Sequence, residues 1–434
     1  MRRAGAVDFF NILTGPELLE MTEALLPEHR ERLYPPTVTL SMFIKQSLAF
    51  DRSCQRAVDS WAAQRAAEGL RVASIRTGAY CRARSRLPLE MIVALTRESG
   101  RLLSHRAQRQ WCWRGRCVKL ADGTGISMPD TAENQGRFPQ PASQAEGVGF
   151  PLVGLVGIVC LSSGAVLEAA IGAHASKGQS EQDLFRGLWG TLHSGDVLLA
   201  DALYCSYFQI ATLQAAGVDV LLEQHGSRNT DFRRGRSLGK RDHLVSWPKP
   251  TTRPAWMSVE QYRAAPDQIT VREVKIQGRV LVTTMLDVPK GELGALYEQR
   301  WHIELDIRNS KTTLGMEVLR CRTPQMVEKE LWVALLAYNL IRLLMAQAAS
   351  STGVRPREIS FKHTLQLWSA WCTYPSSNPP SELFRLIAQV PVGNRPARCE
   401  PRVRKRRPKS FPWLKVPRAT ARQRIRKRRH SLCA

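Results

Sequence analysis

The sequence predicts a mixed α/β protein with an all-helical segment in front of its sheet, and three observations carry this prediction. Residues 1–112 show apolar side chains at helical spacing. From Arg116 onward, short apolar segments typical of strands alternate with helical stretches. A chain of 434 residues with 43% hydrophobic side chains is also long and apolar enough for two or three domains with a large core.

Residues 1–112 are expected to form a small helical domain. Helically spaced apolar residues lie on either side of Pro35-Pro36, and a further helix is expected at about 88–108. The spaced residues are Leu18, Leu19, Met21, Leu25 and Leu26, then Met42, Phe43, Ile44 and Leu48. Eleven arginines stand between Arg71 and Arg116 against two acids. The sequence leaves two roles open for these arginines, contact with nucleic acid or a structural role.

The segment 113–350 is expected to be a second domain built on a mixed sheet. Strands are expected at 117–121, 152–160, 166–173, 196–200 and 218–223, with helices at about 180–192 and 207–216. The uncharged stretch 147–167 holds five glycines and a proline, so it fits the two strands of a hairpin better than a membrane span. An apolar helix at about 326–348 is expected to cap the core.

A β-rich insertion is expected within this domain at about 224–290. The 102 residues between Asp201 and Glu304 are too many for a simple connection. They contain turn-forming prolines and two strand candidates, 269–276 and 280–286. The insertion is also basic, through Arg228, Arg233, Arg234, Arg236, Lys240 and Arg241.

The net charge of +25 favours a polyanionic partner, of which nucleic acid is the first candidate. Between Arg395 and His430, sixteen Lys and Arg against one acid supply +15 of this charge. The region 351–434 is therefore expected to be partly disordered, with a tail that neutralises phosphates without reading base sequence. Ten cysteines without a Cys-x-x-Cys pair and no secretory signal predict a soluble cytoplasmic protein with reduced thiols and no membrane partner.

Tyr297, Arg300, Glu304 and Lys311 would lie within an arc of about 60° if they shared one helix. On such a stripe Glu304 can hold a divalent cation, while Arg300 and Lys311 can bind neighbouring phosphates. The alternative is a surface helix on which Arg300 and Glu304 form an i,i+4 ion pair. The same helical phase places His302 away from the stripe, at the surface.

Two upstream aspartates favour the cation site. Asp122 and Asp201 each follow an apolar strand segment and precede a turn or loop. Ligands collect at the carboxyl edge of α/β sheets, so two aspartates there and Glu304 from a helix can hold two divalent cations. Oxygen-only ligands favour Mg²⁺ or Mn²⁺ over zinc. Asp122, Asp201 and Glu304 are the candidate catalytic and metal-binding residues; the alternative is that the aspartates only terminate strands.

Together these residues resemble the DDE transposases of bacterial insertion sequences, in particular the family of insertion sequence four. The third acidic residue of that family lies in a Tyr-x2-Arg-x3-Glu-x6-Lys signature, which is filled here by Tyr297, Arg300, Glu304 and Lys311. Asp122-Gly123-Thr124 resembles its first aspartate motif, and Leu199-Ala200-Asp201 resembles the second.

Two positions depart from the family pattern. Ala202 stands where many relatives have an arginine that contacts phosphate, and Ile307 stands where many have phenylalanine. Neither position is a metal ligand.

The resemblance implies an RNase H-like catalytic domain at 113–350 and binding of transposon ends by residues 1–112. It implies cut-and-paste transposition on two Mg²⁺ or Mn²⁺ ions, with Tyr297, Arg300 and Lys311 against DNA phosphates. A hairpin intermediate is implied too, in which an insertion-domain tryptophan stacks on an extruded base. Trp256 is the candidate, although ordinary packing of Trp256 or Trp247 is the alternative.

The implied partners are the double-stranded inverted-repeat ends of an element and its target DNA, bound by a homodimer in the bacterial cytoplasm at the nucleoid. Two other functions remain open at this point. One is a catalytically inactive, transposase-derived DNA-binding protein, and the other is a structure-specific nuclease on the same fold.

Overall fold

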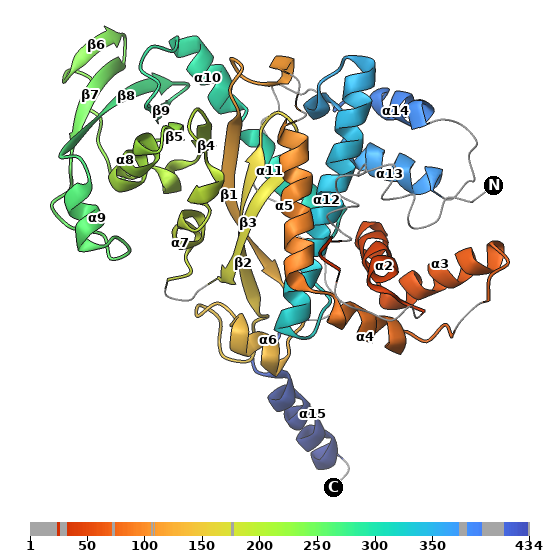
Figure 1. Cartoon of the computed structure of the whole chain (residues 1–434). Helices are drawn as coiled ribbons and strands as arrows, with labels where there is room; N and C mark the ends of the chain where they lie inside the picture. The colour runs from red at the N-terminus through yellow and green to blue at the C-terminus, as the bar shows by residue number, and fades with distance from the viewer. Residues whose placement is uncertain are drawn as a thin grey trace.

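One sheet of nine strands crosses the protein, in the order β3-β2-β1-β4-β5-β9-β8-β7-β6 (Figure 1). The computed structural model describes residues 24–26, 33–71, 74–105, 107, 109–174, 178–372, 380–392 and 412–432, and the helix expected around Leu18 lies outside them. The strands are β1 (Val118–Ser127), β2 (Leu152–Cys160), β3 (Val166–Ala173), β4 (Val197–Ala200), β5 (Asp219–Glu223), β6 (Arg236–Gly239), β7 (Asp242–Pro248), β8 (Gln268–Ile276) and β9 (Arg279–Thr283).

The first five strands form the mixed sheet of an RNase H-like domain. β1, β2 and β3 pair antiparallel, whereas β1 and β4 pair parallel, as do β4 and β5. All five strand predictions are confirmed in position, but the first was too short. Because β1 runs on to Ser127, Asp122 stands in the middle of that strand and not at its end.

The expected insertion strands extend this same sheet. β9 pairs antiparallel with the edge strand β5, and β8, β7 and β6 follow by antiparallel pairing. β8 and β9 match the two strand candidates, while β6, β7 and the short helix α9 (Val259–Ala264) had no clear sequence signal. The exposed cations Arg233, Arg234, Arg236, Lys240 and Arg241 gather at the β6–β7 hairpin.

Helices cover both faces of the sheet (Figure 1). On one face lie α5 (Leu89–His105), α11 (Trp301–Arg308) and α12 (Pro324–Thr352), packed on β1 and β3 side chains such as Leu120 and Val166. On the other lie α7 (Glu181–Arg186) and α8 (Tyr207–Ala215), packed on Ala121 and Val156. Successive residues of a strand point to opposite faces, so Asp122 shares the α11 face with Leu120.

Helix α12 is the central core helix of this arrangement. Its length and hydropathy would suit a membrane span, yet 94% of its apolar window is buried inside the protein. It contacts α5, α13 (Phe361–Trp371) and α14 (Pro380–Ala388), which confirms the expected helix that caps the core.

The N-terminal helices α2 (Pro36–Leu48), α3 (Cys54–Ala67) and α4 (Gly78–Arg86) pack into a small cluster beside α12. Arg84 of α4 is structural: it is 5% exposed, its guanidinium lies 4.0 Å from the centre of the Phe43 ring, and it donates to Gln46 Oε1 at 3.1 Å. Arg82 and Arg86 on the same helix are exposed.

Part of the C-terminal tail is described by the structure. Its described part, 412–432, contains the helix α15 (Arg418–Leu432), and a side chain at Gly147 would meet the Pro417 ring at 3.1 Å. The first basic run, 404–407, lies outside the described residues. Eight of the ten cysteines lie within the described ranges, and all eight are free thiols.

A buried ion network fastens α11 to the rest of the core. Asp306 is 3% exposed and accepts hydrogen bonds from Arg342 of α12, from Arg357 at 2.7 Å and from the Tyr338 hydroxyl at 2.9 Å. Arg357 also donates to the backbone oxygens of Leu161 and Cys160 in the β2–β3 turn. One carboxylate therefore connects the helix that carries Glu304 with α12 and the sheet.

We expect Asp306→Asn to lower the free energy of unfolding by about 3–5 kcal/mol, because it leaves two buried guanidinium groups without their counter-charge. Urea denaturation of both proteins measures the difference. Glu382→Gln is the matched control, since the Glu382–Arg385 pair is about half exposed and its loss should cost under about 0.5 kcal/mol. An Asp306→Asn protein as stable as the control variant would contradict the role of this network.

Candidate active site

The parallel pairing of β1 with β4 brings the two candidate aspartates together. Leu120 of β1 stands opposite Leu199 of β4, and two residues further along each chain come Asp122 and Asp201. Because paired residues on adjacent strands point to the same face, both carboxylates belong to the side covered by α11. The predicted proximity of these two residues is therefore built into the strand register.

Each aspartate is oriented by the backbone that follows it. Asp122 Oδ1 accepts from its neighbour Gly123 N at 2.8 Å, and Asp201 Oδ1 accepts from Leu203 N at 2.8 Å in the turn Ala202–Tyr204. Such local hydrogen bonds fix the carboxyl groups without a side-chain partner.

Glu304 reaches the same side of the sheet from α11. Its Oε1 accepts a hydrogen bond from Arg300 Nη2 at 2.8 Å, so the i,i+4 ion pair that the sequence analysis gave as an alternative is present. Both side chains are partly buried, with 15% of Arg300 and 29% of Glu304 exposed. Arg300 also interacts electrostatically with Asp122, so it lies close to both Glu304 and the first aspartate.

The prediction of a single helix from Tyr297 to Lys311 is wrong. α10 (Lys290–Glu298) ends before Gln299, α11 begins at Trp301, and a π-helical turn follows over Asn309–Thr313. π-Helical turns widen the helix and are common at functional sites. Tyr297, Glu304 and Lys311 therefore lie on three consecutive elements, and Arg300 lies in the break between the first two.

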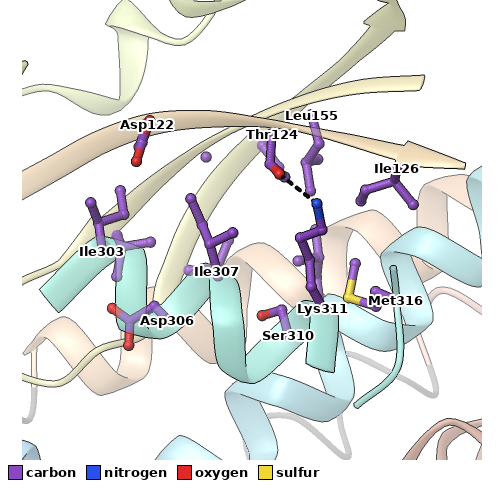
Figure 2. Close-up of a pocket in the computed structure, with 15 residues that line it drawn as sticks. Asp122, Thr124, Ile126, Leu155, Ile303, Asp306, Ile307, Ser310, Lys311 and Met316 are labelled. Carbon is purple, nitrogen blue, oxygen red and sulfur yellow. Dashed lines mark hydrogen bonds between the residues drawn. The ribbon is translucent and has the colours of Figure 1, made fainter. Parts of the chain in front are cut away.

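These breaks give Tyr297 and Lys311 different surroundings from those expected. Tyr297 is 6% exposed and donates its hydroxyl hydrogen to Glu223 of β5 at 3.2 Å, away from the helix face of Glu304. Lys311 Nζ donates to Thr124 Oγ1 at 3.2 Å and to Gly125 O at 2.9 Å on β1 (Figure 2). Lys311 thus ties the π-helical turn to the strand that carries Asp122.

Glu181, a fourth carboxylate, lies at the site although no spacing in the sequence pointed to it. It is the first residue of α7, and a side chain at Gly123 would come within 2.4 Å of its Cδ. Its Oε1 accepts the hydroxyl hydrogen of Tyr204 at 2.7 Å, and Tyr204 itself comes three residues after Asp201. The only sequence signal was an acid directly after the helix cap Ser180.

Within the described part of the chain, no Lys or Arg forms an ion pair with Asp122, Asp201 or Glu181. Burial raises the pKa of Asp122 to about 7, and the nearby carboxylates of Glu181 and Asp201 add to the rise, against the Gly123 N–H and Arg300. Burial also raises the pKa of Tyr204, and the same three carboxylates add to that rise, Glu181 most strongly. Asp122, Asp201 and Glu181 therefore repel one another in the absence of a bound cation.

An apolar cavity explains why Asp122 is poorly hydrated. It has a volume of about 50 Å³ and lies between β1–β3 and α11, with Asp122 at one side and Lys311 at the other (Figure 2). Ile303, Ile307 and Met316 are among its lining residues, so the isoleucine that departs from the family pattern packs as a core residue. Apolar walls disfavour the ionised form of a carboxyl group beside them.

Two other predicted positions differ in their surroundings. His302 is half-buried and not at the surface; burial, and the nearby cations of Arg357 and Arg342, lower its pKa to about 4. Trp256 is half-buried: its ring lies edge-on to Trp189 at 5.8 Å, with the Arg186 guanidinium 4.7 Å from its centre.

Trp247, the alternative to Trp256, is 2% exposed and donates to Glu273 Oε1 at 2.8 Å, so its role is packing.

The described residues contain no group of three His, Cys, Asp or Glu side chains already arranged around a common metal position. Glu304 is turned to Arg300, while Asp122, Asp201 and Glu181 gather at the sheet. A cation held by all of them would require small side-chain movements, above all the release of Glu304 from its ion pair.

Comparison with known proteins agrees with this geometry. The family model of the Transposase DDE domain matches residues 113–340, more than half of the chain. The curated transposase InsG for insertion sequence element IS4, from Escherichia coli (strain K12), is 31% identical over 362 residues, which cover 78% of each protein.

Adjacent aspartates on β1 and after β4, a glutamate on a facing helix and the domain match define the class of this protein as a DDE transposase. More closely, the chain belongs to the transposase family of insertion sequence IS4, as its identity with the InsG protein shows. Its general function is DNA transposition, carried out on DNA by a domain type that uses divalent metal ions.

We expect the metal-free protein to lose stability as pH rises, relative to an Asp122→Asn variant. The folded-state pKa of Asp122, about 7, exceeds the unfolded value of about 3.8. The unfolded chain therefore ionises first, so the destabilisation by Asp122 starts near pH 4, grows with pH and is complete above about pH 7.

Melting temperatures in EDTA from pH 4 to 8 test this expectation. The Asp122→Asn protein should melt at a temperature close to that of the wild type at pH 4 and above it at pH 8. A difference that does not change with pH would contradict the raised pKa.

Proposed function

We propose that this protein cleaves the ends of an insertion sequence by metal-dependent hydrolysis and then joins the freed 3′-hydroxyl to target DNA. Asp122, Asp201 and Glu304 are the proposed catalytic residues and cation ligands. The observation that carries the proposal is the register of β1 and β4, which puts two aspartates side by side opposite the glutamate helix.

The donor set fits two Mg²⁺ or Mn²⁺ ions. All its atoms are carboxylate oxygens, which these hard cations prefer. Burial, and after it the neighbouring carboxylates of Glu181 and Asp201, raises the pKa of Asp122, and such ions would neutralise these carboxylates. When bound, the cations supply the activation of water or of a 3′-hydroxyl and the stabilisation of the leaving oxygen.

The cationic side chains are proposed to exchange partners when DNA binds. Arg300 is held beside Glu304 and Asp122, so it can turn from Glu304 to a phosphate once a cation replaces it as counter-charge. Lys311 holds Thr124 and Gly125 of β1 and stands at the edge of the same site, where it can meet a second phosphate. Tyr297 would first have to leave Glu223.

A hairpin intermediate is the finer step that we propose for cleavage, with Trp256 stacked on an extruded base. The Trp256 ring lies beside Arg186 of α7, the helix that begins at Glu181, so it belongs to the neighbourhood of the carboxylates. Its edge-on contact with Trp189 leaves it half-buried, and stacking would need a change of this packing.

DNA binding outside the catalytic domain is proposed for two regions. The first is residues 1–112, where Arg82 and Arg86 are exposed on α4. The second is the basic tail, including α15 with exposed Arg422, Arg424 and Arg426. Domain limits of 1–112, 113–350 and 351–434, and a homodimer that pairs two ends, are parts of the same proposal.

We expect Glu304→Ala to keep the affinity for the element's ends but to slow Mg²⁺- or Mn²⁺-dependent cleavage by about 10³-fold. The reason is that a lost metal ligand removes several kcal/mol of transition-state stabilisation. Cleavage of DNA carrying the sequences that flank the reading frame measures the rate, and a mobility shift measures binding.

Glu317→Ala is the control, because this exposed glutamate contacts β1 only through its backbone oxygen. If the Glu304→Ala protein cleaves DNA at the wild-type rate, the assignment of Glu304 as a catalytic residue is wrong. Absence of cleavage by the wild type with either metal would favour the inactive DNA-binding protein. Hydrolysis without strand-transfer products would favour a nuclease.

For the tail, we expect that Arg422→Gln, Arg424→Gln and Arg426→Gln together weaken DNA binding and flatten its salt dependence. Each phosphate contact contributes about 0.9 to the slope of log K against log salt, so three lost contacts lower it by about 2.7. Truncation after Asn394 should lower the slope further. An unchanged slope for both proteins would show that the tail does not contact phosphates.

A further inference from the structure

Glu181 lies next to Asp122, in space that is open because the glycine of the Asp-Gly-Thr motif has no side chain. Gly123 points to the face of the sheet opposite the Asp122 side chain, where α7 lies. A Cβ there would fall 2.4 Å from Glu181 Cδ and 2.7 Å from Glu181 Oε2. Because Gly123 has no side chain, the Glu181 carboxyl group can lie directly against the Gly123 backbone.

Two contacts hold Glu181 in this place, and both come from the turn after Asp201. The Tyr204 hydroxyl donates to Glu181 Oε1 at 2.7 Å, and Gln182 Nε2 donates to the Leu203 backbone oxygen at 2.7 Å. Tyr204 is fully buried, and its ring meets Phe185 of α7 edge-on at 4.7 Å. The position of Glu181 is thus coupled to the loop that carries the second aspartate.

A role in starting α7 does not account for Glu181. The first turn of that helix is capped by Ser180, whose hydroxyl oxygen accepts from Asp183 N at 3.2 Å, while Asp183 Oδ2 accepts from Ser180 N at 3.0 Å. Glu181 takes no part in this capping box. Among the described residues no Lys or Arg forms an ion pair with Glu181, and its side chain accepts a hydrogen bond there from the neutral hydroxyl of Tyr204.

An acid with a neutral partner, placed beside two other acids, costs free energy unless a cation joins them. The Glu181 carboxyl group lies against Gly123, the residue directly after Asp122, and is held there by Tyr204, so it adds a negative charge next to Asp122. This mutual repulsion does not help the protein to fold. A site that binds divalent cations from solution needs such a group of carboxylates.

We propose that Glu181 is a fourth acidic residue of the cation site, which shares a divalent ion with Asp122 and Asp201 while Tyr204 and Gly123 position its carboxylate. This inference rests on the proposed cation site and adds to it a ligand from the opposite face of the sheet. Glu304 and Glu181 then approach the aspartates from α11 and α7, on the two sides of β1.

Binding of Mn²⁺ to the full-length protein tests this inference apart from catalysis. Electron paramagnetic resonance of free Mn²⁺ gives the affinity for the wild type and for Glu181→Gln. We expect a loss of about tenfold or more, the usual effect of removing a ligand or its direct support. Gly123→Ala, which pushes the carboxyl group away, and Tyr204→Phe, which removes only the hydroxyl, should each weaken binding as well.

Two reference variants make the outcomes distinct. Glu133→Gln is the control, because Glu133 is an exposed acid in the first turn of α6 (Ala132–Arg137), and its Mn²⁺ affinity should be unchanged. Asp201→Asn should lose Mn²⁺ binding if the proposed cation site exists.

If Glu181→Gln binds Mn²⁺ with wild-type affinity while Asp201→Asn loses binding, the proposed role of Glu181 is overturned and the cation site stands. Wild-type affinity in both would overturn the cation site itself. Circular dichroism checks that each variant folds. If Glu181→Gln does not fold, Gly123→Ala and Tyr204→Phe decide, and wild-type affinity in both of these would overturn the inference.

Discussion

The site depends on one constraint: the parallel register of β1 and β4 holds like charges side by side. Backbone pairing between two buried strands fixes Asp122 beside Asp201, whatever the electrostatic cost. The apolar cavity under β1 increases that cost, since it withholds water from Asp122. A folded core of this size can support such local repulsion, and the proposed cation would convert the repulsion into affinity.

On the helix side of the site, the carboxylate is paired with a cation. Glu304 has a counter-charge, Arg300, and its helix is fastened from beneath by Asp306 with Arg342 and Arg357. The two carboxylates sit two residues apart on α11, one facing the site and one buried in the core. The buried network keeps α11 in place, while the ion pair of Glu304 can open. Such a division lets one side chain move without displacing its helix.

Much of the fold was predictable because it follows from local patterns. The hairpin strands β2 and β3 were expected at the residues where they occur, since their apolar stretch is interrupted by a single glycine turn. The closeness of Asp122 and Asp201 was also predictable, because each directly follows a short apolar segment of the sequence. The end of β1 was misjudged, since Asp122-Gly123-Thr124 reads as a turn, although pairing with β2 keeps it extended.

Other features depended on tertiary contacts that no local pattern contains. Tyr297 beside the break at Gln299 contacts Glu223, and Lys311 in the π-helical turn contacts Gly125, both far away in the sequence. Glu181 was missed because its approach to Gly123 needs α7 to pack across the sheet. Arg84 could not be told from the neighbouring basic residues in the sequence, although in the structure it is buried against Phe43. Long-range pairing decided each of these cases.

The most direct test of this account is the position of Mn²⁺ in crystals of the full-length protein, located by anomalous scattering at the manganese edge. The account predicts a peak between the carboxylates of Asp122 and Asp201, with Glu304 turned away from Arg300 toward the metal. A peak at a distance from both aspartates, or none at saturating Mn²⁺, would contradict it.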